Sequence, residues 1–304
     1  MNARAIFLTR DGEWRTLWRI VAMFVLVIAV VFVVNFGWRA VGLPGQRDST
    51  PWHFMLLAIL ITGGVTAVLV FLLRLFERRG PDAIGLPFSL QAVLPTLIGT
   101  ALGAVPILLI VIAAVIGGYG KVSVGTLSLG MLPTVLLPML IAGFLFAAWE
   151  ELVLRGYLLR QLSIGLNPAA AVVITGVLFG LLHSGNPGAN WEGLVYTAIG
   201  GILMGWLMVR SGSLWLLIGY HFGWNATAYQ LFGLELSGLD ADASFLIATL
   251  DGSEWLTGGS YGFEASLPAV IAETVVLLAV LRFRLFPARS SALAFGPDAP
   301  GARR

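Results

Sequence analysis

Long apolar runs, separated by short polar segments, repeat along the 304-residue chain. About 20 consecutive apolar residues are enough for a helix to cross roughly 30 Å of hydrocarbon. The pattern therefore predicts an all-α, polytopic helical membrane protein with about eight transmembrane helices. The predicted spans are 17–37, 53–75, 90–117, 131–163, 168–184, 192–210, 213–233 and 266–286.

The spans separate into two groups by the polar residues that they carry. Residues 1–130 hold three spans, in which charged residues are confined mostly to the ends. Residues 131–286 hold the other five and contain glutamate, arginine and histidine within apolar surroundings, which predicts the helical core of the protein. Residues 287–304 are small, polar and contain proline, a composition that predicts a disordered cytoplasmic tail.

Composition excludes several classes of protein. The chain is 58% hydrophobic and only 11% charged, whereas soluble domains carry about 25% charged residues. The absence of cysteine excludes disulfides, thiolate metal sites and a cysteine nucleophile. The basic balance, with a pI near 9.2, does not indicate nucleic acid, because the charges flank apolar spans. The first apolar run is too long, and lacks the small-residue cleavage site, for a signal peptide.

Charge asymmetry between the connecting segments predicts the topology. With the N-terminus in the cytoplasm, the inside segments hold 15 of the 18 basic residues and the outside segments hold 3. The longest outside loop, about 234–265, carries six acidic residues and no base. This distribution follows the positive-inside rule. It predicts a multi-pass protein of the cell membrane with both termini in the cytoplasm, and the compact, arginine-rich chain suggests a bacterial source.

The stretch FAAWEELVLRGY places three charges inside the fourth span. Each charge costs roughly 2.5–3.5 kcal/mol at a bilayer centre on insertion scales. Glu151 and Arg155 are four residues apart in the acid-first order, so they can pair on one helix face. Glu150 is rotated by about 100° and lacks that partner. Helix–helix bonding alone accounts for the Glu151–Arg155 pair.

Two further polar clusters occur in later spans of the core. His183 ends the segment FGLLH, and His221 and Asn225 lie four residues apart in HFGWN. At about 1.5 Å of rise per residue, Glu150, His183 and His221 lie roughly 13–22 Å from the cytoplasmic ends of their helices and can share one layer. An unpaired carboxylate, two imidazoles and an amide are the groups that water activation and oxyanion binding require.

These clusters resemble the three motifs of the CPBP (CAAX protease and bacteriocin-processing, or Abi) family of intramembrane proteases, written EExxxR, FxxxH and HxxxN. In this chain the matching positions are Glu150, Glu151, Arg155, Phe179, His183, His221 and Asn225. The similarity covers about residues 130–285.

The resemblance implies a fold, an activity and a role for each residue. It implies a membrane-embedded endopeptidase whose site is buried in the helix bundle, with Glu150 as the general base and His183 assisting it. His221 and Asn225 would donate to the oxyanion, while Glu151 and Arg155 would position Glu150. Family members are often named metalloproteases, so a divalent metal such as zinc on Glu150, His183 and His221 and a metal-free mechanism both stay open.

Two other classes of function are compatible with the apolar spans. One is a non-catalytic membrane binding protein, such as an immunity or scaffold factor on the same fold. The other is a small transporter, which is disfavoured because the ionisable residues cluster instead of tracing a path across the bilayer. The expected partners are the lipid bilayer and a membrane-associated peptide or protein, and no nucleic acid; the physiological substrate, CAAX or otherwise, is not readable.

The sequence also predicts where the site should open. Water must reach Glu150, while charges facing lipid are unfavourable, so the polar groups should face the interior of the bundle. We expect a wet cavity between the fourth, fifth and seventh spans that opens toward the cytoplasmic half. Small residues, with Gly176 and Gly180 on one span and Gly201 and Gly205 on the next, should let the helices approach closely around it.

Overall fold

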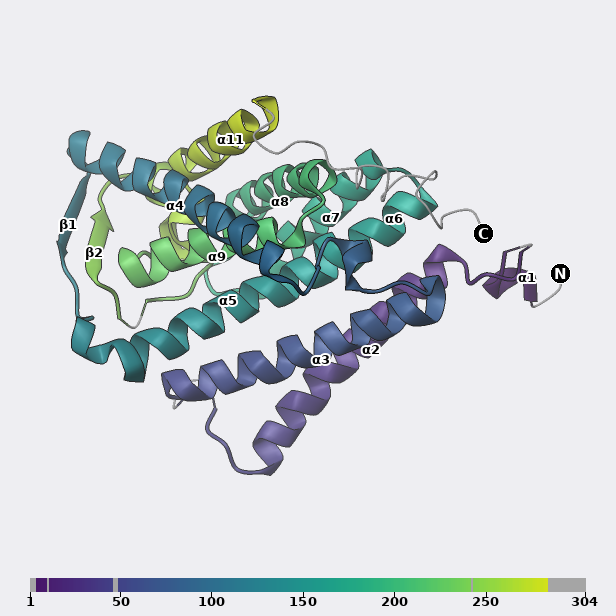
Figure 1. Ribbon diagram of the computed structural model, residues 1–304. Helices are drawn as coiled ribbons and strands as arrows, with labels where there is room; N and C mark the ends of the chain where they lie inside the picture. Colours follow the sequence, from purple (N-terminus) through teal and green to yellow (C-terminus); the bar gives the residue numbers. More distant parts are fainter. Residues whose placement is uncertain (1–3, 10, 46–48, 242, 284–304) are drawn as a thin grey trace.

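The chain forms a bundle of long helices in the computed structural model, which describes residues 4–9, 11–45, 49–241 and 243–283 (Figure 1). The predicted tail, 287–304, lies outside the described residues. The bundle helices are α2 (Thr16–Ala40), α3 (Pro51–Glu77), α4 (Val93–Ile116), α5 (Leu137–Glu151), α6 (Leu159–Gly165), α7 (Pro168–Leu182), α8 (Trp191–Ser211), α9 (Leu214–Ala226) and α11 (Leu267–Arg282). The all-α polytopic fold class is thereby confirmed.

The helix bounds agree closely with the predicted spans. Among the described residues, six helical segments are long and apolar enough to cross a membrane. The fourth of them, Leu129–Gly165, is a continuous segment of 37 residues that contains α5 and α6. The last two predicted spans correspond to α9 and α11, which are helices of only 13 and 16 residues. The exact count of eight spans is therefore not confirmed.

Side-chain caps explain where the core helices begin. Asn167 accepts a hydrogen bond from the backbone of Ala170 at the start of α7, and Asn190 accepts one from Gly193 at the start of α8. Ser213 and Ser266 cap α9 and α11 in the same way. A capping oxygen satisfies one of the backbone N–H groups that a helix start leaves unpaired. The short polar segments between the core spans therefore act as helix starts.

A small antiparallel sheet joins two long loops. Strand β1 (Gly120–Val124) pairs with β2 (Leu246–Leu250), with Gly120 opposite Leu250. The sequence analysis did not predict this pairing. Figure 1 shows both strands at one end of the bundle, while α6 and the N-terminal segment lie at the other end.

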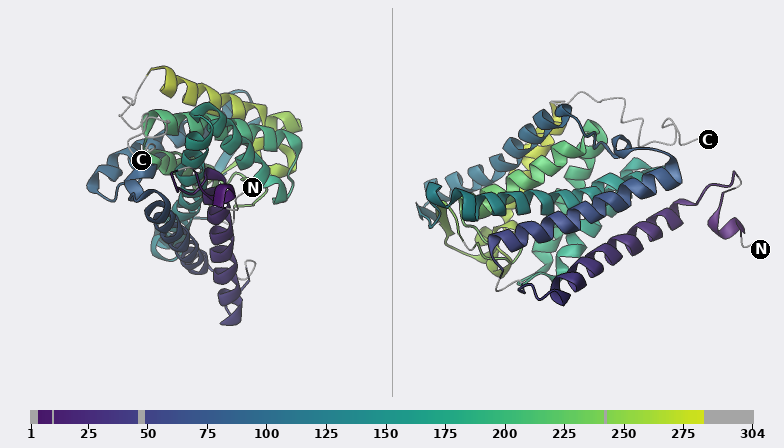
Figure 2. Two further views of the ribbon diagram at one scale, coloured as in Figure 1. Left: turned by 90° about the vertical axis from the view of Figure 1, so that its right-hand side faces the viewer. Right: turned by 60° about the horizontal axis from the view of Figure 1, so that its bottom comes forward.

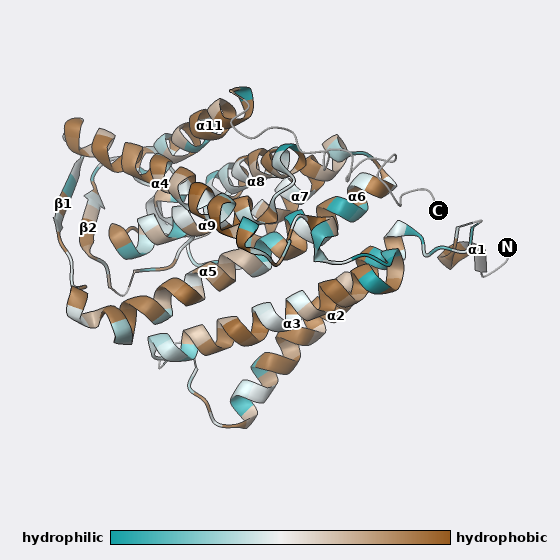
Figure 3. Cartoon of the chain, in the orientation of Figure 1, coloured by the Kyte–Doolittle hydropathy of each residue, from teal (hydrophilic) through white to brown (hydrophobic). Residues whose placement is uncertain are grey.

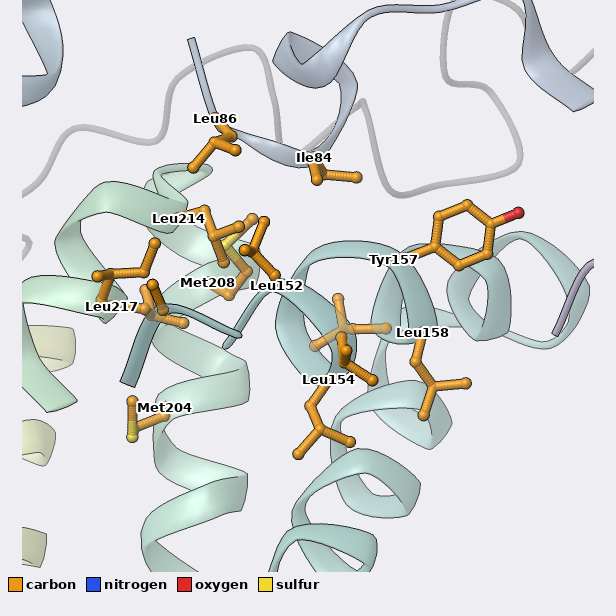
Figure 4. Close-up of a cluster of buried hydrophobic side chains, with 14 of the residues drawn as sticks. Ile84, Leu86, Leu152, Leu154, Tyr157, Leu158, Met204, Met208, Leu214 and Leu217 are labelled. Carbon is orange, nitrogen blue, oxygen red and sulfur yellow. The ribbon is translucent and has the colours of Figure 1, made fainter. Parts of the chain in front are cut away.

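The end that holds α6 is closed by polar and apolar contacts. Arg160 of α6 pairs with Glu77 at the end of α3 at 2.6 Å, and both side chains are almost completely buried. Next to this pair lies part of the hydrophobic core, which includes Leu152, Leu158 and Leu214 (Figure 4). These contacts pack α6 against the end of α3.

Apolar residues also cover much of the outer surface. The helices are predominantly hydrophobic along their length (Figure 3), as a lipid-facing surface requires. Helix α2 lies at the edge of the bundle (Figure 2), and only 11% of its most apolar window is buried inside the protein. Its exposed side chains would contact hydrocarbon.

Candidate active site

The two adjacent glutamates stand at a change in helix type. Glu150 and Glu151 end α5, and the chain continues directly into η6 (Leu152–Leu158), a π-helix whose residues are all buried. A π-helix bonds i to i+5, so it contains an extra residue in each turn and is frequent at functional sites. The predicted span 131–163 was expected to be one continuous α-helix here.

Glu151 and Arg155 form the predicted ion pair. An Arg155 guanidinium nitrogen lies 3.0 Å from Glu151 Oε1, and both side chains are 0% exposed. A second nitrogen of Arg155 donates to the carbonyl of Gly201 on α8 at 3.3 Å. The guanidinium also lies over the ring of Phe179, 4.2 Å from the ring centroid. Arg155 therefore connects three helical segments at the base of the site.

His221 lies between the two glutamates. Its Nδ1 is 3.0 Å from Glu151 Oε1, and its Nε2 is 4.0 Å from Glu150 Oε2. An ionised carboxylate only accepts hydrogen bonds, so Nδ1 carries the proton that it shares with Glu151. That contact leaves Nε2 facing Glu150. Glu151 thus orients His221, a role in addition to the pairing with Arg155 that its spacing indicated.

Phe179 holds the second histidine beside the first. His183 follows α7 at the start of a short 3₁₀ turn, and its Nδ1 donates to the carbonyl of Phe179 at 2.7 Å. The Phe179 ring lies edge-to-face with the rings of both His183 and His221, at centroid distances of 4.8 and 5.8 Å. The spacing FxxxH therefore places an aromatic wedge between the two imidazoles.

One cavity of about 740 Å³ collects the polar groups of all three motifs. Glu150, His183, His221 and Asn225 all line it. These residues come from α5, the end of α7 and α9, which are the fourth, fifth and seventh predicted spans. The prediction that these spans build the cavity agrees with this lining.

The cavity also has an apolar side, formed by α2, α3 and the first half of α5. The apolar lining residues there are Val31, Phe54, Leu57, Ile61, Met139 and Ala142. A polar site next to an apolar wall can accept a peptide bond at the end of a hydrophobic segment. Helices from residues 1–130 therefore contribute directly to the shape of the site.

The direction in which the cavity extends differs from the prediction. We expected it to open toward the cytoplasmic half, which the predicted topology assigns to the end that holds the N-terminus. The lining reaches the opposite end, with Asn186, Gln230, Ser237 and Leu239, and includes no residue of α6. The physical reason is packing, since the hydrophobic core fills the end near α6 (Figure 4). Helix depth alone could not reveal which end was filled.

Two further carboxylates reach the cavity, and the sequence analysis did not single them out. Glu273 of α11 lines it, and its carboxylate lies against Gly200 of α8, where a Cβ would meet Glu273 Oε2 at 2.5 Å. Glu264 also lines it and accepts a hydrogen bond from Trp224 Nε1 at 2.9 Å. The signal for Glu273 was present, because it is an acidic residue within an apolar span.

Glycines set the separation of α4 and α9. A Cβ on Gly99 or Gly103 of α4 would lie about 2 Å from a carbonyl oxygen of α9, at 2.1 and 2.0 Å, and Gly219 and Gly223 of α9 are just as close to α4. Each helix thus carries a small-xxx-small pattern, which allows backbones to touch. This contact positions the helix that carries His221, and the two GxxxG patterns could have predicted it.

The predicted glycine contact between α7 and α8 is also present. A Cβ on Gly176 would meet the backbone of Ile202 at 2.6 Å, and one on Gly180 would meet the carbonyl oxygen of Leu194 at 2.4 Å. Gly201 faces both Gly176 and the guanidinium of Arg155, at 3.0 and 3.1 Å from its ideal Cβ. Close helix approach and the Arg155 hydrogen bond therefore depend on the same small residues.

The predicted metal set was tested against the arrangement of side chains. Within the described residues, no group of three or more His, Cys, Asp and Glu side chains is arranged to hold a metal ion. Nδ1 of both His183 and His221 is bonded to a protein acceptor, which leaves Nε2 of each ring as the nitrogen that could bind a metal. A metal on Glu150, His183 and His221 stays a prediction.

Comparison with known proteins finds a match in the part of the chain that holds the site. Residues 130–227 match the family model described as "Type II CAAX prenyl endopeptidase Rce1-like". This match agrees with the resemblance drawn from the three motifs, over less than half of the chain. The matched segment contains every residue of the three motifs.

A curated relative shares part of the chain. The "Uncharacterized protein YyaK" of Bacillus subtilis (strain 168) is 36% identical over 77 residues, which are 24% of this chain. The chain spans about a quarter of the length of that relative, because the matched part is 25% of it. The relative is itself uncharacterized, so it adds no activity or substrate.

Proposed function

We propose that this protein is an intramembrane endopeptidase that hydrolyses a peptide bond of a membrane-associated substrate, and that Glu150 is the general base. The observation that carries the proposal is the convergence of Glu150, His183, His221 and Asn225 from three helical segments on one cavity within the bundle. The match to an endopeptidase family supports the same activity.

The proposed reaction begins with a water molecule in the cavity. Glu150 takes a proton from this water while the water oxygen attacks the carbonyl carbon of the scissile peptide bond. His183, whose Nε2 is left free by the contact of Nδ1 with Phe179, helps to position the water. The product of this step is a tetrahedral intermediate that carries a negative oxygen.

Hydrogen-bond donors then stabilise that negative oxygen. Asn225 donates through its amide, and His221 donates through Nε2 when its ring carries both protons. Glu151 holds His221 in the required orientation through Nδ1. The C–N bond then breaks, and the proton held by Glu150 passes to the leaving amine. One water molecule is consumed, and the products are the new carboxyl end and the new amino end of the substrate.

The test compares the wild-type protein with Glu150→Gln in lipid nanodiscs, on a library of membrane-spanning peptides analysed by mass spectrometry. Loss of the carboxylate should lower cleavage by about 10²–10⁴, the usual contribution of a general base. Glu192→Gln is the matched control, because this residue lies in the first turn of α8 and outside the cavity lining. Near-wild-type cleavage by Glu150→Gln would refute the mechanism; binding of peptides without cleavage by the wild type would favour the scaffold alternative.

A further inference from the structure

The two ends of the bundle differ in charge and in access. At the end with α6, the described basic residues include Arg15, Arg74, Arg78, Arg79 and Arg160. The opposite end, with β1 and β2, carries Arg39, Lys121 and several acidic residues, which are Glu235, Asp240, Asp251, Glu254 and Glu264. By the positive-inside rule, the arginine-rich end belongs in the cytoplasm.

The cavity belongs to the acidic end. Its lining runs from Glu150, in the middle of the bundle, to Ser237 and Leu239 in the loop that follows α9. Leu239 is 54% exposed, so the lining reaches the protein surface there. At the arginine-rich end, the pair of Arg160 and Glu77 is buried beside the hydrophobic core. An apolar groove of about 760 Å³ reaches Arg74 and Phe88 there, but Glu150, His183, His221 and Asn225 do not line it.

From these two observations we propose that the cavity admits water and substrate from the non-cytoplasmic side of the membrane. The substrate class is then a membrane-anchored or secreted segment presented at that surface, and cytoplasmic protein tails are excluded. The identity of the occupant as a substrate rests on the proposed protease function, whereas the side from which the cavity is reached does not.

The chain offers a direct test because it contains no cysteine, so single cysteines can be added to an unreactive background. Thr197→Cys places a small, nearly isosteric thiol in the cavity wall, and Leu239→Cys places one at its surface. Asp82→Cys marks the arginine-rich end, because Asp82 is the exposed residue of the turn Pro81–Ile84 after α3. Val195→Cys is the matched control for the cavity, since Val195 is on the same helix as Thr197, is 44% exposed and does not line the cavity.

Each variant is expressed in spheroplasts and treated with a membrane-impermeant thiol reagent added from outside, before and after permeabilisation. We expect Thr197→Cys and Leu239→Cys to react in intact spheroplasts, Asp82→Cys to react only after permeabilisation, and Val195→Cys to stay unreacted in hydrocarbon. Reaction of Asp82→Cys from outside, or of Thr197→Cys only after permeabilisation, would overturn the inference.

The labelling experiment tests the side from which the cavity is reached, and the cleavage assay tests the activity, so either result can contradict its own proposal alone. A protein that labels as expected but cleaves no peptide in nanodiscs would keep its outward-facing cavity and lose the proposed activity. A protein that cleaves peptides in nanodiscs, where both faces are accessible, but labels from the cytoplasmic side would keep the activity and lose the sidedness.

Discussion

Replacing Arg155 by methionine would leave a buried carboxylate without its cationic partner. Glu151 and Arg155 are both 0% exposed and are 3.0 Å apart. Methionine keeps much of the length of the side chain, so the main loss is electrostatic and not a cavity. Breaking a buried ion pair on one side typically costs about 3–5 kcal/mol of unfolding free energy. We expect Arg155→Met to be destabilised by that amount.

The double variant Glu151→Gln with Arg155→Met removes both charges. Because no unpaired buried charge remains, part of the lost stability should return, with a coupling free energy of about 0.5–3 kcal/mol between the two sites. Activity should not return. Glu151 also holds Nδ1 of His221 at 3.0 Å, and a glutamine at this position cannot provide the carboxylate that orients the ring.

The assay is a double-mutant cycle on the purified protein in mixed micelles. The free energy of unfolding is measured for the wild type, both single variants and the double variant, and peptide cleavage is measured on the same samples. A double variant that is as unstable as the sum of the single losses would show that the two residues do not interact. A double variant that regains both stability and cleavage would show that Glu151 has no role beyond the ion pair.

Three further predictions follow from the geometry. Asn225→Ala should lower kcat by about 10²–10³, the usual effect of losing one oxyanion donor, with little change in thermal stability; a wild-type kcat would remove Asn225 from the mechanism. Gly103→Ala should lower both stability and cleavage, because its Cβ would lie 2.0 Å from the carbonyl oxygen of Tyr220. Gly63→Ala should be tolerated, because its Cβ would have nothing within 4 Å. Equal melting temperatures for the two variants would contradict the close contact of α4 and α9. Glu77→Gln should lower the free energy of unfolding by about 3–5 kcal/mol, because it breaks the buried pair with Arg160. Cleavage should stay intact well below the melting temperature, since neither residue lines the cavity. Lost cleavage in a folded sample would show that this end of the bundle takes part in the reaction.

Local pattern was enough to predict most of the helices and one ion pair of the candidate site. The span predicted at 168–184 is α7 followed by its 3₁₀ turn, because apolar length and the cap at Asn167 are local properties. The pairing of Glu151 with Arg155 also follows from helical spacing alone.

Features that depend on contacts between distant segments were not predictable in this way. The pairing of β1 with β2 joins loops more than 100 residues apart, and strand register of this kind leaves little trace in either segment. The position of His221 between two glutamates depends on how α9 rotates against α5. The direction of the cavity depended on which end the core filled, which periodicity does not report.

The π-helical segment after Glu151 has a consequence for insertions and deletions. A single residue added to or removed from an α-helix turns everything beyond it by about 100°. The π-helical segment Leu152–Leu158 can absorb such a change, because it holds more residues per turn than an α-helix. If one of these residues were deleted, the segment could return to α-helical bonding while α6 keeps its direction. A deletion within α5 has no such segment to absorb it at that point and should turn Glu150 and Glu151 away from their partners. Homologous sequences should therefore tolerate a one-residue gap in Leu152–Leu158 more readily than one in α5.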